Sequence, residues 1–324
     1  MALGAIVYGQ DALELHQYLL APMVELTQGE LLGRAEYVYD GRHGVVANRT
    51  LTVRASESGS TKSHIKAYSI KQNGQWVSLW RDLALNHRWY WGLGGAIEEE
   101  DFHDLAAGTS RVQNERVVGL VGGFDSRRQQ WLSEGPSQGH ELRLFAETSR
   151  GLGAAFTGNV YRADWRGHLP LGRSVLALRW NEAYGQRDAE RFELGGSKSD
   201  EVVLLPILNE RDFALRGYTT GTPSLMGHRA RVTSVEWRTP LADIDRHLMV
   251  PPVGINRVAL NLFADVGAAW DRDMSPHYHR GIGVELVSEP KVGYLFGLQT
   301  RAGIARGLDE NGSTKIYLRA GRAF

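Results

Sequence analysis

The stretch "RVALNLFADVGAAW", from Arg257 to Trp270, alternates between two kinds of side chain. One row is apolar throughout and consists of Val258, Leu260, Leu262, Ala264, Val266, Ala268 and Trp270. The other row is mixed and includes Asn261, Phe263 and Asp265. Because successive side chains of a strand point to opposite faces, the pattern predicts a β-strand with one apolar and one partly polar face. Asp265 is therefore expected in the middle of a strand, on the face opposite the apolar row.

The same period of two residues recurs along the whole chain. The segments that show it are 15–26, 29–40, 45–56, 63–70, 75–80, 87–99, 115–126, 140–148, 154–165, 174–184, 190–194, 231–241, 257–270, 281–289, 294–307 and 314–324. They predict about sixteen strands. Any number from about twelve to sixteen fits the pattern, because strand boundaries are the part of such a prediction that varies most. The sequence shows no amphipathic helix longer than two turns and no internal repeat. The chain is therefore predicted to be all-β.

Composition restricts the class of protein further. The 324 residues include 37 basic and 37 acidic side chains, so no net charge draws the chain to nucleic acid. The absence of cysteine excludes a disulfide framework and thiolate metal sites. No segment approaches the roughly 20 consecutive apolar residues of a transmembrane helix. The mean hydropathy of -0.32 fits a soluble protein or a membrane barrel, since only alternate residues of a barrel strand face lipid.

Aromatic side chains gather near the ends of the predicted strands, as Trp180, Trp237 and Trp270 do. Trp and Tyr at such positions are typical of the interface between a membrane and water. We therefore predict a transmembrane antiparallel β-barrel. The alternative is a soluble β-sandwich in which these aromatic residues fill the core.

The connections between the later predicted strands differ in length. Residues 125–140 and 271–280 read as long links, whereas 149–153 and 288–291 read as tight ones. Long loops on one rim and short turns on the other are typical of an outer-membrane barrel. Residues 242–256 depart from this pattern, because they read as a long link where a short turn is expected.

A segment of roughly thirty residues, 196–228, separates "ERFEL" from "RVTSVEWR". Loops of this length without secondary structure are uncommon unless they are functional or disordered. This segment is rich in Leu, Val and Phe and contains "LRGY", Leu215 to Tyr218. It is therefore expected to pack against something, and the lumen of the barrel is the available cavity.

Several short motifs occur in a fixed order in the second half of the chain. They are "FELGG" at 192–196, "LRGY" at 215–218, "VEWRTPL" at 235–241, "FADVG" at 263–267, "GIGVEL" at 281–286 and the terminal Phe324. In this order they resemble the C-terminal barrel of the outer-membrane assembly and translocation superfamily. That superfamily includes bacterial surface antigens, BamA-type insertases, TamA, the mitochondrial sorting barrel and two-partner-secretion transporters. The resemblance implies a sixteen-stranded barrel whose long extracellular loop, 196–228, folds into the lumen.

The resemblance also assigns roles to residues of this loop and of the wall. It implies that Arg216, at the loop tip, reaches Asp265 and Glu236 on the inner wall. Alternation independently places Glu236, Arg238 and Asp265 on the face away from lipid. A pair of arginine and carboxylate can be bidentate, so it would fix the position of the loop as well as hold it.

Glycines and the end of the chain complete the set of candidate site residues. Gly217 is expected to allow a tight approach at the loop tip, and Tyr218 to stack in the lumen. Gly195 and Gly196 are expected to turn the chain inward at the loop entry. By the resemblance, the terminal Phe324, with apolar residues such as Leu318 at alternate positions before it, is the signal that the barrel-assembly machinery recognises.

By the resemblance, the function is insertion or translocation of polypeptides at the bacterial outer membrane, without covalent chemistry or a cofactor. The first and last strands would form a seam that opens laterally, and the Arg216 loop would gate the pore. The expected partners are outer-membrane lipids and polypeptide substrates or the assembly machinery, with a monomeric barrel. Residues 1–324 are expected to form one barrel domain without a periplasmic substrate-capture module. Alternatives are a non-transporting anchor or surface antigen fused to an upstream domain, a barrel hydrolase, and the soluble binding module.

Other chemistry is weakly indicated. His277 and His279 are interpreted as parts of an exposed loop, because no third metal ligand is near in sequence. Residues 98–104, "EEEDFHD", are interpreted as a solvated acidic loop. No catalytic or nucleotide-binding motif is present, so the chain is not expected to be an enzyme. A hydrolase would have to use histidines whose geometry the sequence does not fix, namely His64, His87, His103 and His140.

Overall fold

The structure, a computed structural model, describes most of the chain. The described residues are 2–4, 7–13, 15–26, 29–55, 65–82, 88–105, 108–130, 133, 135–197, 206–249, 253–292, 296–297 and 299–320. Phe324 lies outside them, as do His64 and His87.

The described chain is built almost entirely of β-strands. In the large sheet they are β1 (Ala2–Gly4), β2 (Val7–Gln10), β3 (His16–Glu25), β4 (Leu31–Tyr39), β5 (His43–Ala55), β6 (Ile65–Arg81), β7 (Arg88–Asp104), β8 (Thr109–Asp125), β9 (Gly139–Thr148), β10 (Asn159–Leu171), β11 (Ser174–Gly185), β15 (Arg229–His247), β16 (Val253–Trp270), β17 (His279–Val292), β18 (Phe296–Gly297), β19 (Thr300–Gly307) and β20 (Thr314–Ala320). The elements outside that sheet are β12 (Phe192–Leu194), β13 (Asp212–Phe213), the 3₁₀ helix η1 (Pro223–Leu225) and β14 (Met226–Gly227). No helix in the described ranges is long and apolar enough to cross a membrane.

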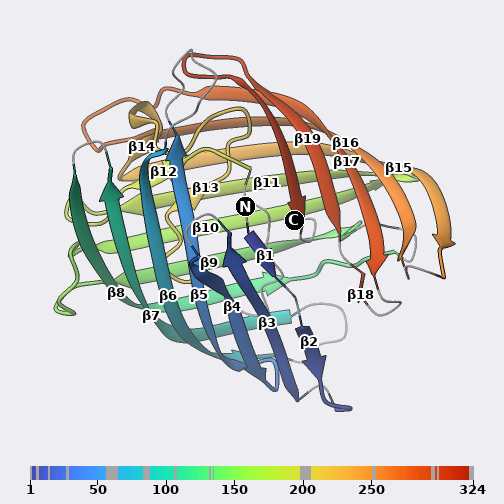
Figure 1. Cartoon of the computed structure of the whole chain (residues 1–324), viewed down its shortest axis with the longest axis horizontal. Coiled ribbons are helices and arrows are strands. Elements are labelled where there is room, and N and C mark those ends of the chain that lie inside the picture. The colour runs from blue at the N-terminus through green and yellow to red at the C-terminus, as the bar shows by residue number, and fades with distance from the viewer. Residues whose placement is uncertain are drawn as a thin grey trace.

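The large sheet forms the wall of a β-barrel (Figure 1). Its strands occupy fifteen positions, because β1 and β2 both pair with β3 and β18 and β19 both pair with β17. Each position pairs with the next along the chain, and every such pairing is antiparallel. The sheet curls so that its first strands, in blue, and its last, in red, both face the viewer, with the green strands behind them. A single curled sheet excludes the two packed sheets of a β-sandwich.

The two faces of the wall are opposite in character. On β15, Val235 and Trp237 are exposed on the outer face, whereas the charged Glu236 and Arg238 between them are buried on the inner face. On β16, Leu262 is 48% exposed while Asp265 is 1% exposed. Apolar side chains outside and buried charges inside reverse the arrangement of a soluble protein, and they are what a membrane barrel requires.

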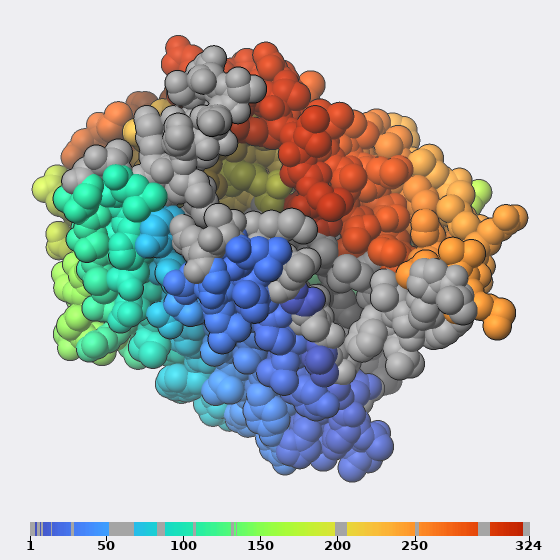
Figure 2. Space-filling model, viewed as in Figure 1, coloured from blue at the N-terminus to red at the C-terminus, as the bar shows by residue number. Residues whose placement is uncertain are grey.

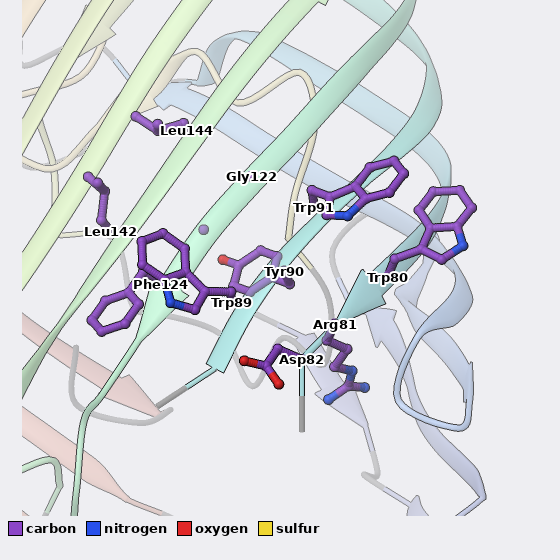
Figure 3. A pocket seen from close by; sticks show the side chains of 11 residues that line it. Trp80, Arg81, Asp82, Trp89, Tyr90, Trp91, Gly122, Phe124, Leu142 and Leu144 are labelled. Carbon is purple, nitrogen blue, oxygen red and sulfur yellow. The ribbon is translucent and has the colours of Figure 1, made fainter. Parts of the chain in front are cut away.

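Aromatic residues gather on the outer face where β6, β7 and β8 meet one rim (Figure 3). The rings of Trp80 and Trp91 stack with centroids 4.6 Å apart, and Trp89 lies 4.6 Å from Phe124. These side chains border a shallow pocket of about 600 Å³, and Gly122 leaves open space between them.

Residues 186–197 and 206–228, the described parts of the inward-folded segment, leave the wall between β11 and β15 and fold against its inner face. Their strands form a small sheet, in which β12 pairs in parallel with β13 and antiparallel with β14. The yellow β12, β13 and β14 lie within the curve of the wall in Figure 1. A buried core joins this segment to inward-facing wall residues, and its members are Val160, Ala183, Ala189, Phe192, Leu194, Phe213, Leu215, Tyr218, Leu225, Ala230, Val232 and Ala269. Figure 2 shows a hollow next to the last strands, in red, with residues from the middle of the chain visible behind it.

Several strand boundaries differ from those expected. Residues 65–70 and 75–80 are parts of one strand, β6, and 98–104 continue β7 as strand instead of forming an acidic loop. Most of 242–256 extends β15 and β16, which reduces the link to 248–252. Residues 192–194 belong to the small sheet, so "ERFEL" is not a wall strand.

The exclusion of "ERFEL" from the wall also changes the rim at which each long link lies. With it in the wall, the long links 125–140 and 271–280 would be six strands apart and would share a rim. Five wall strands separate them (β9, β10, β11, β15 and β16), so these links lie at opposite rims. The expectation of long loops on one rim and short turns on the other is therefore wrong for these two links.

Candidate functional site

Arg216 of the inward-folded segment lies directly on Asp265 of β16. Its Nε donates to Asp265 Oδ2 at 2.7 Å and its Nη2 to Oδ1 at 2.6 Å, which makes the pair bidentate. The backbone N–H of Arg216 donates to the same carboxylate at 3.1 Å. The carboxylate thus fixes both the side chain and the backbone of the loop at this point.

Two further wall carboxylates meet the same guanidinium. Arg216 Nη1 donates to Glu236 Oε1 at 2.7 Å and to Glu285 Oε1 at 3.3 Å. Glu236 belongs to β15 and Glu285 to β17, so one arginine bridges three neighbouring strands. The ring of Phe263 lies beneath it, 3.5 Å from the guanidinium carbon to the ring centroid. This cation–π contact leaves the guanidinium edge free for the carboxylates.

The wall supplies more arginines to the same carboxylates. Arg238 donates to Glu236 Oε2 at 3.0 and 2.9 Å, and Arg301 donates to Glu285 Oε2 at 3.1 Å. Arg319 of β20 also donates to Glu285, as does the Tyr317 hydroxyl at 2.6 Å. The cluster therefore joins β15, β16, β17, β19 and β20 through charge-assisted bonds.

Charge in this cluster is nearly balanced. Its acids are Glu236, Asp265 and Glu285, and its bases are Arg216, Arg238, Arg301 and Arg319. Glu236 is 0% exposed and Arg216 is 4% exposed. Burial alone would lower the pKa of Arg216, but the Asp265 and Glu236 carboxylates raise that pKa well above its ordinary value. The guanidinium therefore stays charged, and the ion pairs of the cluster hold the loop tip against the wall.

Glycines allow the loop to approach the wall this closely. Gly217 has φ +94°, and a Cβ there would overlap the backbone of Gly307 in β19. A Cβ at Gly281 of β17 would overlap the carbonyl oxygen of Arg216. Both contacts are between backbones, so neither could be relieved by a rotamer change.

Tyr218 holds the loop tip to the wall through its own hydroxyl group and ring. Its hydroxyl donates to the carbonyl oxygen of Arg280 at 2.8 Å and accepts from the backbone N–H of Asp309 at 3.2 Å. Its ring meets His279 edge-on, with centroids 5.4 Å apart. Its carbonyl oxygen accepts the N–H of Gly196 at 2.9 Å.

The glycines at the loop entry both have positive φ. The angle is +149° at Gly195 and +68° at Gly196. A Cβ at Gly195 would lie 2.8 Å from the backbone nitrogen of Thr220. The two arms of the loop therefore touch at this pair of glycines.

The structure brings together most of the residues singled out from the sequence, and it adds others. Arg216, Gly217, Tyr218, Glu236, Arg238 and Asp265 form one cluster. Leu318 does not belong to it, because its side chain is exposed on the outer face of β20. Glu285, Arg301, Arg319 and Phe263 were not singled out, although the motif "GIGVEL" contains Glu285 and "FADVG" contains Phe263.

The remaining sequence candidates do not assemble into a second site. His277 is exposed, but His279 is buried, so the interpretation of both as an exposed loop is wrong for His279. Glu98 is buried and its Oε1 lies 2.8 Å from Lys71 Nζ. His103 lies next to the end of β7 and His140 next to the start of β9, so these two histidines lie at opposite rims. Within the described ranges, no group of three or more metal-binding side chains is close enough to hold an ion.

Comparison with known proteins supports the fold. No protein-family model matches this sequence, and no curated protein matches it either. Among solved structures, the chain is similar to BamA from Haemophilus ducreyi lacking POTRA domains 1–3. The TM-score is 0.52 and the identity 11%, over 99% of this chain and 69% of that one. The chain therefore has a BamA-type barrel fold.

Proposed function

We propose that the chain is a bacterial outer-membrane β-barrel that inserts or translocates other polypeptides, with the loop 196–228 as a gate inside its lumen. The exposed apolar outer face and the aromatic patch at its rim support placement in a membrane. The inner cluster around Arg216 supports the gate, because it fixes the loop tip to carboxylates of three neighbouring wall strands.

The observation that carries the transport role is the seam between the first and last strands. Across the described ranges, no backbone pairing joins β20 to β1 or β2. Fifteen positions give fourteen successive antiparallel pairings, so the two edge strands run in the same direction. Direct closure would make a parallel pair, which is less stable per residue than an antiparallel one.

A strand that enters the seam antiparallel to both edges restores the alternating order of the wall. We propose that a client polypeptide supplies such a strand during insertion. The client would leave by lateral opening, and no covalent chemistry is involved.

Site-directed disulfide trapping tests this proposal. The chain has no cysteine, so an introduced thiol is unique. Ile316→Cys places it on the exposed face of the edge strand β20, and Leu262→Cys places a matched one in the middle of the wall. Each variant barrel is first inserted into liposomes of phosphatidylethanolamine and phosphatidylglycerol. A urea-unfolded client barrel that has a single cysteine in one of its strands is then added.

We expect mixed disulfides at Ile316→Cys and few at Leu262→Cys, together with faster insertion of the client than into empty liposomes. Equal trapping at the two positions, or no acceleration, overturns the proposal. The second candidate is then a non-transporting anchor or surface-antigen barrel. The core that the loop builds inside the lumen favours that candidate, since it fills space that a passing polypeptide would need.

A further inference from the structure

The inward-folded segment touches the wall at a second place, distant in sequence from β15–β20. The backbone N–H of Leu208 donates to Gln75 Oε1 of β6 at 2.9 Å, and Gln75 Nε2 donates to the carbonyl oxygen of Pro206 at 3.0 Å. The Leu208 side chain is buried in an apolar patch on the inner wall. The wall residues of that patch are Val38, Val77, Leu79, Ala96, Val117, Val121 and Phe145.

Glu147 of β9 is the centre of this second contact. It accepts Arg162 Nη2 at 2.8 Å, Arg211 Nη1 at 2.8 Å and the backbone N–H of Asn209 at 3.2 Å. Arg162 of β10 also donates to the carbonyl oxygen of Ile207 at 2.8 Å. Glu147, Arg162 and Arg211 are at most 6% exposed. The Glu147 carboxylate and the two arginines therefore compensate one another's charge in a dry site.

The arrangement reverses the roles seen at Arg216. At Arg216 one loop arginine gathers three wall carboxylates, whereas here one wall carboxylate gathers a wall arginine, a loop arginine and a loop N–H. The two contacts use different strands, β6, β9 and β10 in one case and β15 to β20 in the other. They share no side chain.

The chain between the two contacts is itself held in place. Asp212 and Phe213 pair with β12, and the side chains of Phe213 and Leu215 are buried in the core of the inward-folded segment. Because this core supports the segment from within, release of one contact does not remove the support of the other. Segments with their own packing can open as separate local units.

We infer that residues 206–211 form a second anchor of the loop, centred on Glu147, and that the lumen opens only when both anchors are released. This inference rests on the proposed gating role of the loop. Arg211 and Asn209 are positioning residues for that role. Passage through the barrel then needs two independent events, and loss of either anchor alone leaves the lumen occupied.

A four-member set of chains tests the inference: unaltered, Arg211→Ala, Arg216→Ala and the double variant. Arg187→Ala is the matched control, because Arg187 lies in the same connection between β11 and β15 and its side chain is 84% exposed. Hydrogen exchange in detergent reports separately on 206–211 and 215–218, and conductance in planar bilayers reports on the lumen. Slower migration of unheated samples in electrophoresis identifies any chain that fails to form a barrel.

Arg211→Ala is expected to speed exchange at 206–211 by about tenfold to a hundredfold and to leave 215–218 protected. Arg216→Ala should speed exchange at 215–218 and leave 206–211 protected. The conductance of the double variant should rise far more than the sum of the increases in the two single variants. Exchange at 206–211 unchanged by Arg211→Ala overturns the second anchor. Full opening by Arg216→Ala alone overturns the requirement for two releases. Neither readout uses a client polypeptide, so failure of the insertion assay is a separate result.

A covalent variant covers the case in which Arg211→Ala does not fold. Gln75→Cys and Leu208→Cys can be joined by a short thiol cross-linker, which replaces the second anchor with a bond. In an Arg216→Ala background this bond should keep conductance low, and omission of the cross-linker should allow brief openings. Equal conductance with and without the cross-linker overturns the inference.

Discussion

Replacement of Arg216 with alanine is expected to release the tip of the loop and to leave the wall assembled. The substitution removes both guanidinium bonds to Asp265, the bond at 2.7 Å to Glu236 and the bond at 3.3 Å to Glu285. Glu236 keeps Arg238, and Glu285 keeps Arg301. Asp265, which is 1% exposed in the unaltered protein, loses its guanidinium partner, so it carries most of the cost while the tip stays docked.

The size of the effect follows from that unpaired charge. Breaking a buried ion pair by removing one partner costs about 3–5 kcal/mol. Since about 1.4 kcal/mol is a factor of ten, the ratio of docked to undocked tip should fall by roughly two to four orders of magnitude. Arg216→Lys keeps the charge but loses the bidentate fork, and it should have an intermediate effect.

Hydrogen exchange of residues 215–218 in the folded barrel measures this ratio. Arg231→Ala is the matched control, because Arg231 also holds a carboxylate through two bonds but is 42% exposed beside Glu182. Loss of such an exposed pair costs about 0–1 kcal/mol. If Arg216→Ala exchanges no faster than Arg231→Ala, the cluster does not hold the loop and the reasoning is wrong.

Three other expectations address the outer face, the loop tip and the part of the inward-folded segment around Glu190, which precedes β12. Leu262→Arg should cost about 2–4 kcal/mol if Leu262 faces lipid, seen as a lower urea midpoint in liposomes, whereas Met274→Arg in a rim link should be near neutral. Equal effects would contradict a lipid-facing β16. Gly217→Ala forces a side chain against the wall backbone at φ +94° and should expose the loop to protease, whereas Gly122→Ala meets open space and should not. Burial raises the pKa of Glu190 to about 8, so the neutral form is the one that the folded loop favours. Docking of this part of the segment should then weaken as pH rises from about 4.5, the ordinary pKa, to about 8, and level off above it, and the change should be absent in Glu190→Gln.

Local alternation was sufficient to predict most wall strands and their faces. The outward row of β16 and the inward position of Asp265 follow from the two-residue period of one strand, which needs no knowledge of its neighbours. The same rule was insufficient for "ERFEL", because a run of five alternating residues can pair with any strand that offers an edge. In the structure that edge belongs to the small sheet inside the lumen.

The candidate site was predictable in part, for a related reason. The order of motifs indicated that Arg216 and Asp265 meet, and the structure places them in contact. Glu285 and Arg319 were missed because alternation gives the face of a residue but not its height relative to neighbouring strands. That height is set by the registers between β17, β19 and β20, which depend on the whole wall.

The acidic segment 98–104 was wrongly predicted to be a loop, because charged side chains on both of its faces obscure the two-residue period of a strand. Glu98 points inward to Lys71 and Glu99 is exposed on the outer face, so both faces of this part of β7 are acidic. A strand with charge on both faces gives no hydrophobic alternation to detect.

The span of the loop contacts has a consequence for how the molecule matures. Gln75 and Leu208 are 133 residues apart in sequence, and Tyr218 and Asp309 are 91 apart. Contacts between such distant partners form late, since most of the intervening chain must be in place first. The loop can seat only when the wall strands that it contacts, from β6 to β20, are in place, so a seated loop reports that this part of the cylinder is assembled.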